Sequence, residues 1–401
     1  MKTNSDAVAD IEFQLHWNSP EATHTDCYHA TSVNFWRDYF PPPILEKLMG
    51  IGPGGRRQID LAPEQVLPSC SPTNLRQISR TQFNLRADEG HPLQPRSGRF
   101  YPKGVLSDIP GIFPNNVEPF RCTRADTTDI RIDLNHALAR TPLRLEAIVR
   151  DVRGKQSERG GQSNDWMGIL SSGPGMQCRW DDRPTDFFSD DPFFREDPGR
   201  DSVFYRTPRL VHHIDETARS IIRNLYGSLL SDGMDILDLM SSWVSHLPEN
   251  LKPARVSGLG LNHEELEKNP ALTDYVIHDL NDSPVLPFDS ASFDAVICTV
   301  SVEYLVQPDT VFLEISRVLR PEGIAIMTVS NRWFPPKVIR IWKELHEFER
   351  QGLILEYFHR TGSFKNLETY SIRGLPRPTG DPYYPDMQFS HPVFAVWGQA
   401  T

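Results

Sequence analysis

The chain has 401 residues, 38% of them hydrophobic and 24% charged, which is the composition of a water-soluble globular protein with room for two or three domains. Its net charge of −11 predicts no general binding to nucleic acid. Since no apolar run approaches the length of a bilayer and the first residues are polar, we expect neither a membrane span nor a signal peptide.

The five cysteines are scattered, odd in number and without the Cys-x-x-Cys spacing of many zinc sites. This pattern argues against a disulfide framework and against a metal site, and it is typical of the reducing cytoplasm. We therefore expect a cytoplasmic protein without a bound metal. The cysteines are Cys27, Cys70, Cys122, Cys178 and Cys298.

Residues 1–153 are rich in proline and show strand-like alternation without a long helical pattern. The alternation is clearest at residues 130–134 and 143–149, and residues 58–61 form a further strand candidate. A short amphipathic turn at residues 44–49 follows three prolines. These features predict a small β-rich domain.

Several motifs in this region occur in the order found in FKBP-type peptidyl-prolyl isomerases of the SlyD subgroup, and residues 1–153 resemble that family. The motifs are the runs at 44–50 and 61–64, Gly54, Phe83, Asp133, the Asn-His-Ala-Leu-Ala run at 135–139 and the strand at 143–152. The resemblance implies an α+β FKBP-like fold with an inserted flap domain within about residues 73–131.

Prolyl isomerisation needs an apolar, aromatic-lined pocket in which the proline amide can rotate. The resemblance places Leu67 and Leu145 where the family has pocket aromatics, and it places Phe40 and Pro41 where the family has aliphatic residues. A binding or packing role for this domain is therefore favoured over isomerase activity.

Residues 154–203 are predicted to connect two domains. The polar, glycine-rich run at 154–161 is typical of a flexible linker. Beyond it the chain mixes acids with aromatics, which favours an ordered strap that packs its phenylalanines on a neighbouring domain over a lid that covers a cofactor pocket. These phenylalanines are Phe187, Phe188, Phe193 and Phe194.

Residues 204–401 begin with a helical pattern. Thr207 and Pro208 have the N-cap and first-turn preferences of a helix start, and apolar residues recur at helical spacing to Leu229. His212 and His213 would point to different faces of this helix, so we expect surface or capping roles for them rather than a metal site.

Short apolar strands then alternate with helices, which predicts a parallel, doubly wound α/β sheet. In such sheets ligands bind outside the carboxyl ends of the strands. The predicted strands are residues 236–239, 254–261, 275–279, 295–300 and 324–329, and the predicted helices are residues 263–268 and 309–319. A helix at 338–348 and late strands at 367–373 and 394–397, the last one antiparallel, are expected to follow, with a loop at 373–386.

This order of motifs resembles the class I S-adenosylmethionine (SAM)-dependent methyltransferases of type 11, over about residues 204–330. The motifs are residues 237–239, residues 286–288 with 292–294, and residues 318–321 with Gly323. The resemblance implies a Rossmann-like methyltransferase domain at residues 204–401, with SAM as the cofactor.

The family usually has a glycine-rich turn after its first strand, and this chain has Met240, Ser241, Ser242 and Trp243 there. The usual ribose-binding acid falls near Gly260, with Asn262 as the nearest polar residue, and Asp279 matches the acid that faces the adenine. The resemblance therefore implies a cofactor site whose contacts are partly altered. Its residues are Asp238, Met240, Ser241, Ser242, Trp243, Gly260, Asn262, Asp279 and Leu280.

Residues after the last parallel strand shape the acceptor pocket in this family, so Asn331, Arg332 and Trp333 are candidates for substrate contacts. No catalytic base is identified, and the acceptor could be a small molecule or a protein.

The expected function is SAM-dependent methyl transfer. A non-catalytic SAM-binding or scaffold protein and a prolyl isomerase or folding helper remain alternatives. A hydrolase is disfavoured, because Asp238, Ser241 and His246 are too close in sequence for the usual triad.

Overall fold

The computed structural model describes residues 1–84, 93–155 and 161–401, which form two compact units. The first unit contains residues 1–190 and 344–353, and the second contains residues 191–343 and 354–401. The residues predicted to connect two domains are thus shared between the units. The domain boundaries at 153 and 204 stay a prediction.

The second unit is organised around a sheet whose strands lie in the order β11-β10-β9-β12-β13-β15-β14. The first five strands are parallel, and β15 is antiparallel to both β13 and β14, as the sequence predicts for the last strand. Strands β10 and β11 lie on one side of β9, and β12 and β13 lie on the other, so the strand order reverses at β9. Ligands bind at such a reversal in sheets of this kind. The strands are β9 (Asp235–Leu239), β10 (Arg255–Gly260), β11 (Asp274–Ile277), β12 (Phe293–Thr299), β13 (Leu319–Val329), β14 (Phe364–Arg373) and β15 (Val393–Ala400).

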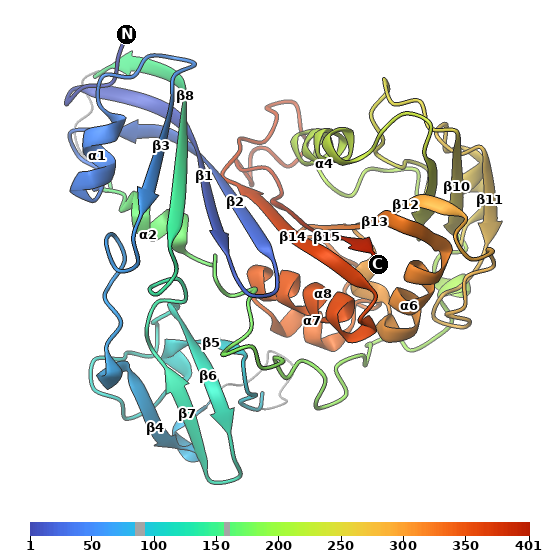
Figure 1. Ribbon diagram of the computed structural model, residues 1–401, viewed down its shortest axis with the longest axis horizontal. Helices are drawn as coiled ribbons and strands as arrows, with labels where there is room; N and C mark the ends of the chain where they lie inside the picture. Colours follow the sequence, from blue (N-terminus) through green and yellow to red (C-terminus); the bar gives the residue numbers. More distant parts are fainter. Residues whose placement is uncertain (85–92, 156–160) are drawn as a thin grey trace. The chain divides into compact units, whose positions relative to one another are not determined.

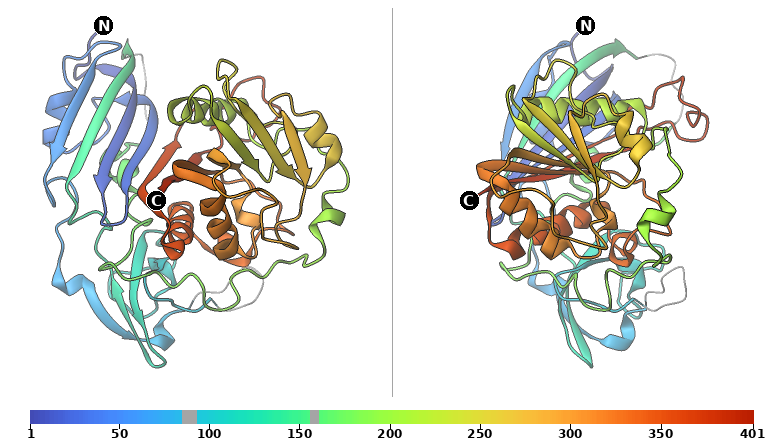
Figure 2. Two further views of the ribbon diagram at one scale, coloured as in Figure 1. Left: turned by 45° about the vertical axis from the view of Figure 1, so that its right-hand side comes forward. Right: turned by 90° about the vertical axis from the view of Figure 1, so that its right-hand side faces the viewer.

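Helices cover both faces of this sheet, with α4 on one face and α6 on the other (Figures 1 and 2). Because both faces are covered, the central strands β9 and β12 are almost wholly buried. Residues 295–298 of β12 form a continuous apolar run, whereas Asp238 interrupts the apolar residues of β9. The helices associated with this unit are α3 (Asp201–Phe204), α4 (Glu216–Leu229), α5 (His263–Glu267), α6 (Pro308–Val318), α7 (Arg340–Glu344) and α8 (Glu347–Thr361), whose first turns belong to the first unit.

Two predicted helices are wrong in their bounds. Helix α4 begins at Glu216 rather than at Pro208, because Asp215 is its N-cap and accepts a hydrogen bond from the Ala218 amide over 3.0 Å. The preceding residues form no helix, so His212 and His213 do not lie on one. The helix predicted at 338–348 is divided into α7 and α8, since His346 Nδ1 accepts a hydrogen bond from the Phe348 amide and caps the start of α8.

In the first unit, strands in the order β2-β1-β8-β3 form an antiparallel sheet around an apolar core. Buried residues of α1 and α2, including Ile44 and Trp166, pack into this core. The predicted β-rich character is confirmed, while the FKBP-like fold stays a prediction. The elements are β1 (Ala7–Asn18), β2 (Thr23–Asn34), α1 (Pro42–Leu48), β3 (Arg56–Leu61), β8 (Leu143–Gly154) and α2 (Trp166–Ser171).

A second, four-stranded sheet in the first unit lies within residues 75–133 and has the order β4-β7-β6-β5. It has an apolar core of its own, in which Phe120 and Ile130 are fully buried. Its strands are β4 (Leu75–Ser79), β5 (Phe100–Pro102), β6 (Pro119–Ala125) and β7 (Asp129–Asp133).

The phenylalanines of the predicted strap differ in burial. Phe187 is buried in the first unit, with the Arg99 guanidinium 5.9 Å from the centre of its ring. Phe194, in the second unit, is 44% exposed, with the Arg340 guanidinium 4.5 Å from the centre of its ring. The packing interpretation is therefore confirmed for Phe187 and wrong for Phe194. Among the described residues, no helix is long and apolar enough to cross a bilayer.

Candidate functional site

A cavity of about 410 Å³ lies at the carboxyl ends of β9, β10, β11 and β12, within the second unit. This volume is in the range of small-molecule binding sites. The predicted site residues that line it are Asp238, Met240, Ser241, Ser242, Trp243, Gly260, Asn262, Asp279, Leu280, Arg332 and Trp333. Asn331 is exposed and is not one of the lining residues.

The turn after β9 is held against the end of β10. The Ser241 amide donates to the Leu259 carbonyl over 2.7 Å, and Met240 has a φ of 58°, in the left-handed region that glycine tolerates best. A side chain at Gly260 would place its Cβ 2.3 Å from the Ser241 carbonyl oxygen. The close approach of the two backbones is therefore made possible by Gly260 at the end of β10, and not by a glycine-rich turn after β9.

Asp238 is a buried carboxylate at the floor of this turn, with 2% of its surface exposed. Burial raises the pKa of Asp238 to about 6, against hydrogen bonds from the Ser241 and Ser245 hydroxyls, which lower it. The Ser241 hydroxyl donates to Asp238 Oδ2 over 2.5 Å. The carboxyl group therefore titrates not far below neutral pH.

Asn262 positions two neighbouring segments through its side chain. Its Oδ1 accepts from the Glu265 amide and so caps α5, and its Nδ2 donates to the carbonyls of Tyr205 and Arg206. With these hydrogen bonds made, Asn262 is a poor substitute for the ribose-binding acid.

Glu265 supplies a carboxylate that sequence reasoning missed. It is buried at the cavity wall, where Oε2 accepts from the Ser242 hydroxyl over 2.7 Å and Oε1 accepts from the Arg209 amide over 2.6 Å. Each oxygen keeps capacity for a second hydrogen bond. The spacing of an Asn N-cap and a Glu three residues later is a helix-start pattern and could have identified this residue.

The end of β11 is tied to the last part of the predicted strap. Asp279 Oδ1 accepts from the Asn281 amide, and Asn281 Nδ2 donates to Asp201 Oδ2 over 2.7 Å. Asp201 is buried and forms ion pairs with Arg195 and Lys337. Asp201, near the end of the strap, and Tyr205, just beyond it, line the cavity, so this segment forms one of its walls.

Four histidines line the same cavity: His212, His213, His246 and His278. The ring of His212 stacks on Trp243, and the ring of His213 meets Phe334 edge-on at 5.0 Å. Partial burial lowers the pKa of His213, with a further contribution from the nearby charges of Arg209 and Arg332. Burial also lowers the pKa of His246 to about 4, and among the described residues its buried Nδ1 has no hydrogen-bond partner. The lowered pKa values favour the neutral form of His213 and His246 at pH 7.

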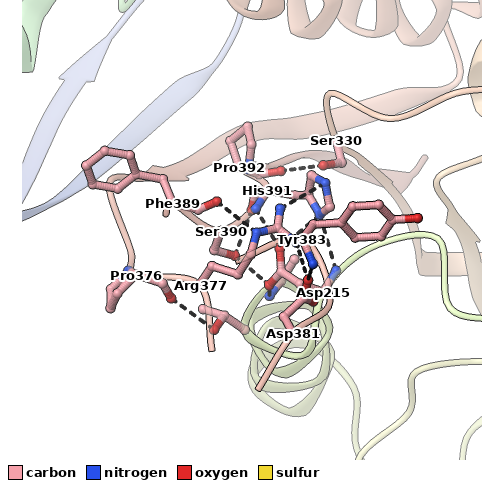
Figure 3. Close-up of polar contacts among 12 residues, drawn as sticks. Asp215, Ser330, Pro376, Arg377, Asp381, Tyr383, Phe389, Ser390, His391 and Pro392 are labelled. Atoms are coloured by element: carbon pink, nitrogen blue, oxygen red, sulfur yellow. Dashed lines mark hydrogen bonds and ion pairs between the residues drawn. The ribbon is translucent and has the colours of Figure 1, made fainter. Parts of the chain in front are cut away.

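The wall formed by residues 211–214 is anchored where it enters α4 (Figure 3). Asp215 receives hydrogen bonds from the Ser390 hydroxyl over 2.7 Å and from the His391 amide over 2.7 Å, and the His391 Nδ1 lies 2.9 Å from its Oδ2. Arg377, which is 2% exposed, lies 3.5 Å from the same oxygen. Burial alone would raise the pKa of Asp215, but these hydrogen bonds outweigh it and lower the pKa.

Comparison with known proteins relates the second unit to methyltransferases. A family described as a methyltransferase domain matches residues 242–327. The ubiquinone biosynthesis O-methyltransferases of three strains of Xanthomonas oryzae pv. oryzae are 28% identical over 106 residues, which are 26% of this chain and 40% of those proteins. The chain thus matches less than half the length of these curated relatives.

Solved structures of methyltransferases are also similar to this chain, at lower identity. The SAM-dependent methyltransferase of Aquifex aeolicus is 16% identical, covering 47% of this chain and 95% of its own, with a TM-score of 0.32. The S-adenosylmethionine-dependent methyltransferase of Mesorhizobium loti is 15% identical, covering 44% of this chain and 96% of its own, with a TM-score of 0.29. Similarity at this level identifies no activity.

Replacing Asp238 by asparagine should stabilise the protein above pH 6. The folded-state pKa of about 6 lies above the ordinary value of 3.8, so the wild-type protein loses stability as the pH rises between these values. A difference of about two pKa units corresponds to roughly 3 kcal/mol. Urea unfolding of Asp238→Asn and wild type from pH 4 to pH 8 measures the effect. A stability difference that does not change with pH would contradict this account.

Replacing Asp215 by alanine should destabilise the protein by about 3–5 kcal/mol, because the buried Ser390 hydroxyl and His391 amide lose their acceptor and Arg377 is left with Asp381 as its ion-pair partner. Glu216→Ala is the matched control, since Glu216 is the next residue and is exposed. Because the pKa of Asp215 is lowered, its contribution is present above the ordinary pKa of 3.8 and is lost as the pH falls below it. Urea unfolding at pH 7 and pH 3 tests both points. Equal losses of stability for Asp215→Ala and Glu216→Ala at pH 7 would refute the role of Asp215 in anchoring residues 211–214.

Proposed function

We propose that this protein is a SAM-dependent methyltransferase. The observation that carries the proposal is a cavity of ligand size at the carboxyl ends of β9, β10 and β11, within a region that matches the methyltransferase domain family. The curated relatives are named as O-methyltransferases, which makes an oxygen atom the first candidate for the methyl acceptor. A cytoplasmic location stays a prediction from the scattered cysteines.

The residues along the cavity fit the groups of the cofactor. When bound, SAM supplies a methyl group on a positively charged sulfur, and it carries an ammonium group, ribose hydroxyls and an adenine amine. Three carboxylates from separate segments, Asp238, Glu265 and Asp279, line the cavity and can accept hydrogen bonds from these groups. We assign Asp279 and Leu280 to the adenine, Glu265 to the ribose, and Asp238 with the Ser241 turn to the amino-acid end.

The chain's own contribution to methyl transfer is to align the acceptor, exclude water and take up a proton. Alignment of two reactants can supply most of the rate enhancement in such a reaction. A neutral acceptor hydroxyl loses its proton as its oxygen gains the methyl group. We assign this proton to a ring nitrogen of His213, since the pKa of His246, about 4, makes His246 a weak base at neutral pH.

Full-length protein should bind both SAM and its demethylated product, S-adenosylhomocysteine, in calorimetric titrations. Asp279→Ala should weaken binding by about tenfold or more, since one hydrogen bond from the adenine amine is lost. Glu265→Gln should weaken it by roughly tenfold to a hundredfold, as a charge-assisted hydrogen bond is typically worth about 1.5–3 kcal/mol.

Glu264→Gln is the matched control for Glu265, because Glu264 is adjacent, exposed and paired with Lys268 outside the cavity lining. Its affinity should equal that of the wild type. An absence of heat with either ligand at millimolar concentration would rule out the proposed cofactor and leave a scaffold role for this unit. Binding without turnover on any acceptor would instead favour a non-catalytic SAM-binding protein.

For the first unit, we propose an FKBP-like domain that binds or packs rather than isomerises. Support comes from the four-stranded sheet at residues 75–133, which has its own core and lies where the resemblance expects the inserted flap. Leu145 is fully buried and Leu67 is 8% exposed, and both pack within the main core of this unit. These are the positions at which the resemblance expects pocket aromatics.

Isomerase activity of the full chain should therefore be weak or absent. The measurement is a proline-isomerisation assay on a short peptide, with an intact FKBP as the positive control. Paired substitutions of Leu67 and Leu145 by aromatic residues test whether the pocket can be restored. Activity of the unaltered protein comparable to that of the FKBP would overturn this assignment.

A further inference from the structure

The acidic groups that line the cavity already have partners within the chain. Asp201 is neutralised by Arg195 and Lys337, and Asp238 accepts from the Ser241 hydroxyl. Glu265 accepts two hydrogen bonds, and Asp279 accepts one from a backbone amide. The acids on this surface are thus tied into the wall, and most of them lie on the side that we assign to the cofactor.

The cationic groups of the cavity are less well satisfied. Arg332 follows β13 and is exposed, and within residues 1–84, 93–155 and 161–401 it forms no hydrogen bond or ion pair. Arg219, on α4, forms an ion pair with Glu216, and its buried Nε has no hydrogen-bond partner in the same part of the chain. In a protein with a net charge of −11, a cavity that carries the guanidinium group of Arg332 without an ion-pair partner among the described residues is a local exception that favours an anionic ligand.

Arg209 is held rigidly on an aromatic surface. Its guanidinium carbon lies 4.7 Å from the centre of the Phe204 ring and 5.3 Å from the centres of the Tyr205 and Phe334 rings. Its Nη2 donates to the Phe204 carbonyl over 3.1 Å, while its buried Nη1 has no partner among the described residues. Such stacking fixes the direction of the guanidinium group before any ligand arrives.

Phe334 joins these side chains into one apolar wall. Its ring centre lies 6.1 Å from those of Tyr205 and Tyr304 and 5.0 Å from that of His213. The charges of Arg209 and Arg332 both lower the pKa of His213, and all three side chains line the cavity. The wall therefore combines flat rings with positive charge beside the residue that we assign as proton acceptor.

We infer that the acceptor is a small aromatic acid, whose ring packs on Tyr205 and Phe334 and whose carboxylate binds Arg332. This inference rests on the proposed methyltransferase function and names the acceptor class of the same site. Arginine suits this role because its planar fork matches the two oxygens of a carboxylate. The aromatic wall favours an acid carried by a ring over a free inorganic anion, although phosphate shares the same charge chemistry.

The test uses benzoate as the probe, benzamide as its uncharged counterpart and inorganic phosphate as the ring-free anion, each titrated by calorimetry into full-length protein. Benzoate should bind at least tenfold more tightly than benzamide, and its affinity should fall as salt is raised. Phosphate at the same concentration should not compete. Arg332→Gln should weaken benzoate binding by about tenfold to a hundredfold, and Arg332→Lys should weaken it less.

Arg200→Gln is the matched control, since Arg200 is exposed and lies outside the cavity lining. Thermal unfolding of each variant shows whether it is folded. Equal affinities for benzoate and benzamide would overturn the inference. Equal losses of benzoate affinity in Arg332→Gln and Arg200→Gln, or efficient competition of phosphate with benzoate, would also overturn it.

The titrations are made with and without saturating S-adenosylhomocysteine, so the two proposals can fail separately. Binding of S-adenosylhomocysteine without binding of benzoate would refute only the aromatic-acid acceptor. Binding of benzoate without binding of S-adenosylhomocysteine would support the anion site and refute the methyltransferase assignment.

Discussion

A single close approach between two backbones determines the shape of the candidate site. The turn after β9 lies directly on the end of β10, with the Ser241 amide hydrogen-bonded to Leu259 and no room for a side chain at Gly260. This contact forces Met240 into the left-handed region, at a cost of about 1–2 kcal/mol for a residue other than glycine. It also brings the Ser241 hydroxyl onto the buried carboxylate of Asp238. Strain of this kind persists only where the surrounding structure holds it, and it is often found at functional sites.

The other walls of the cavity are held by buried charges rather than by the sheet. Asp201 is bound by Arg195, Lys337 and Asn281, and it fixes the segment that carries Tyr205. Asp215 does the same for residues 211–214 through His391 and Arg377. Both segments are irregular, so these ion pairs replace the main-chain ladders that hold the strands. A site held in this way is organised before the ligand binds, which reduces the cost of aligning two reactants.

The sequence predicted the sheet of the second unit well, because its buried parallel strands, such as β12, contain short apolar runs with a recognisable spacing. It failed where a distant contact decided the local structure. Thr207 and Pro208 have the preferences of a helix start, but the buried partners of Asp215 place the start of α4 eight residues further on. The role of Glu265 was hidden because its partners, Ser242 and Arg209, are 23 and 56 residues away. His213 was assigned to a helix face, whereas its ring packs on Phe334 at the cavity.

The central claim is that the cofactor lies between the carboxyl ends of β9, β10 and β11, and a crystal structure of the full chain with S-adenosylhomocysteine tests it most directly. The account predicts ligand density in the cavity, with the adenine beside Asp279, the ribose beside Glu265 and the amino-acid end at the Ser241 turn. Density for the ligand elsewhere in the molecule, or an empty cavity in crystals grown at a saturating concentration, would contradict it.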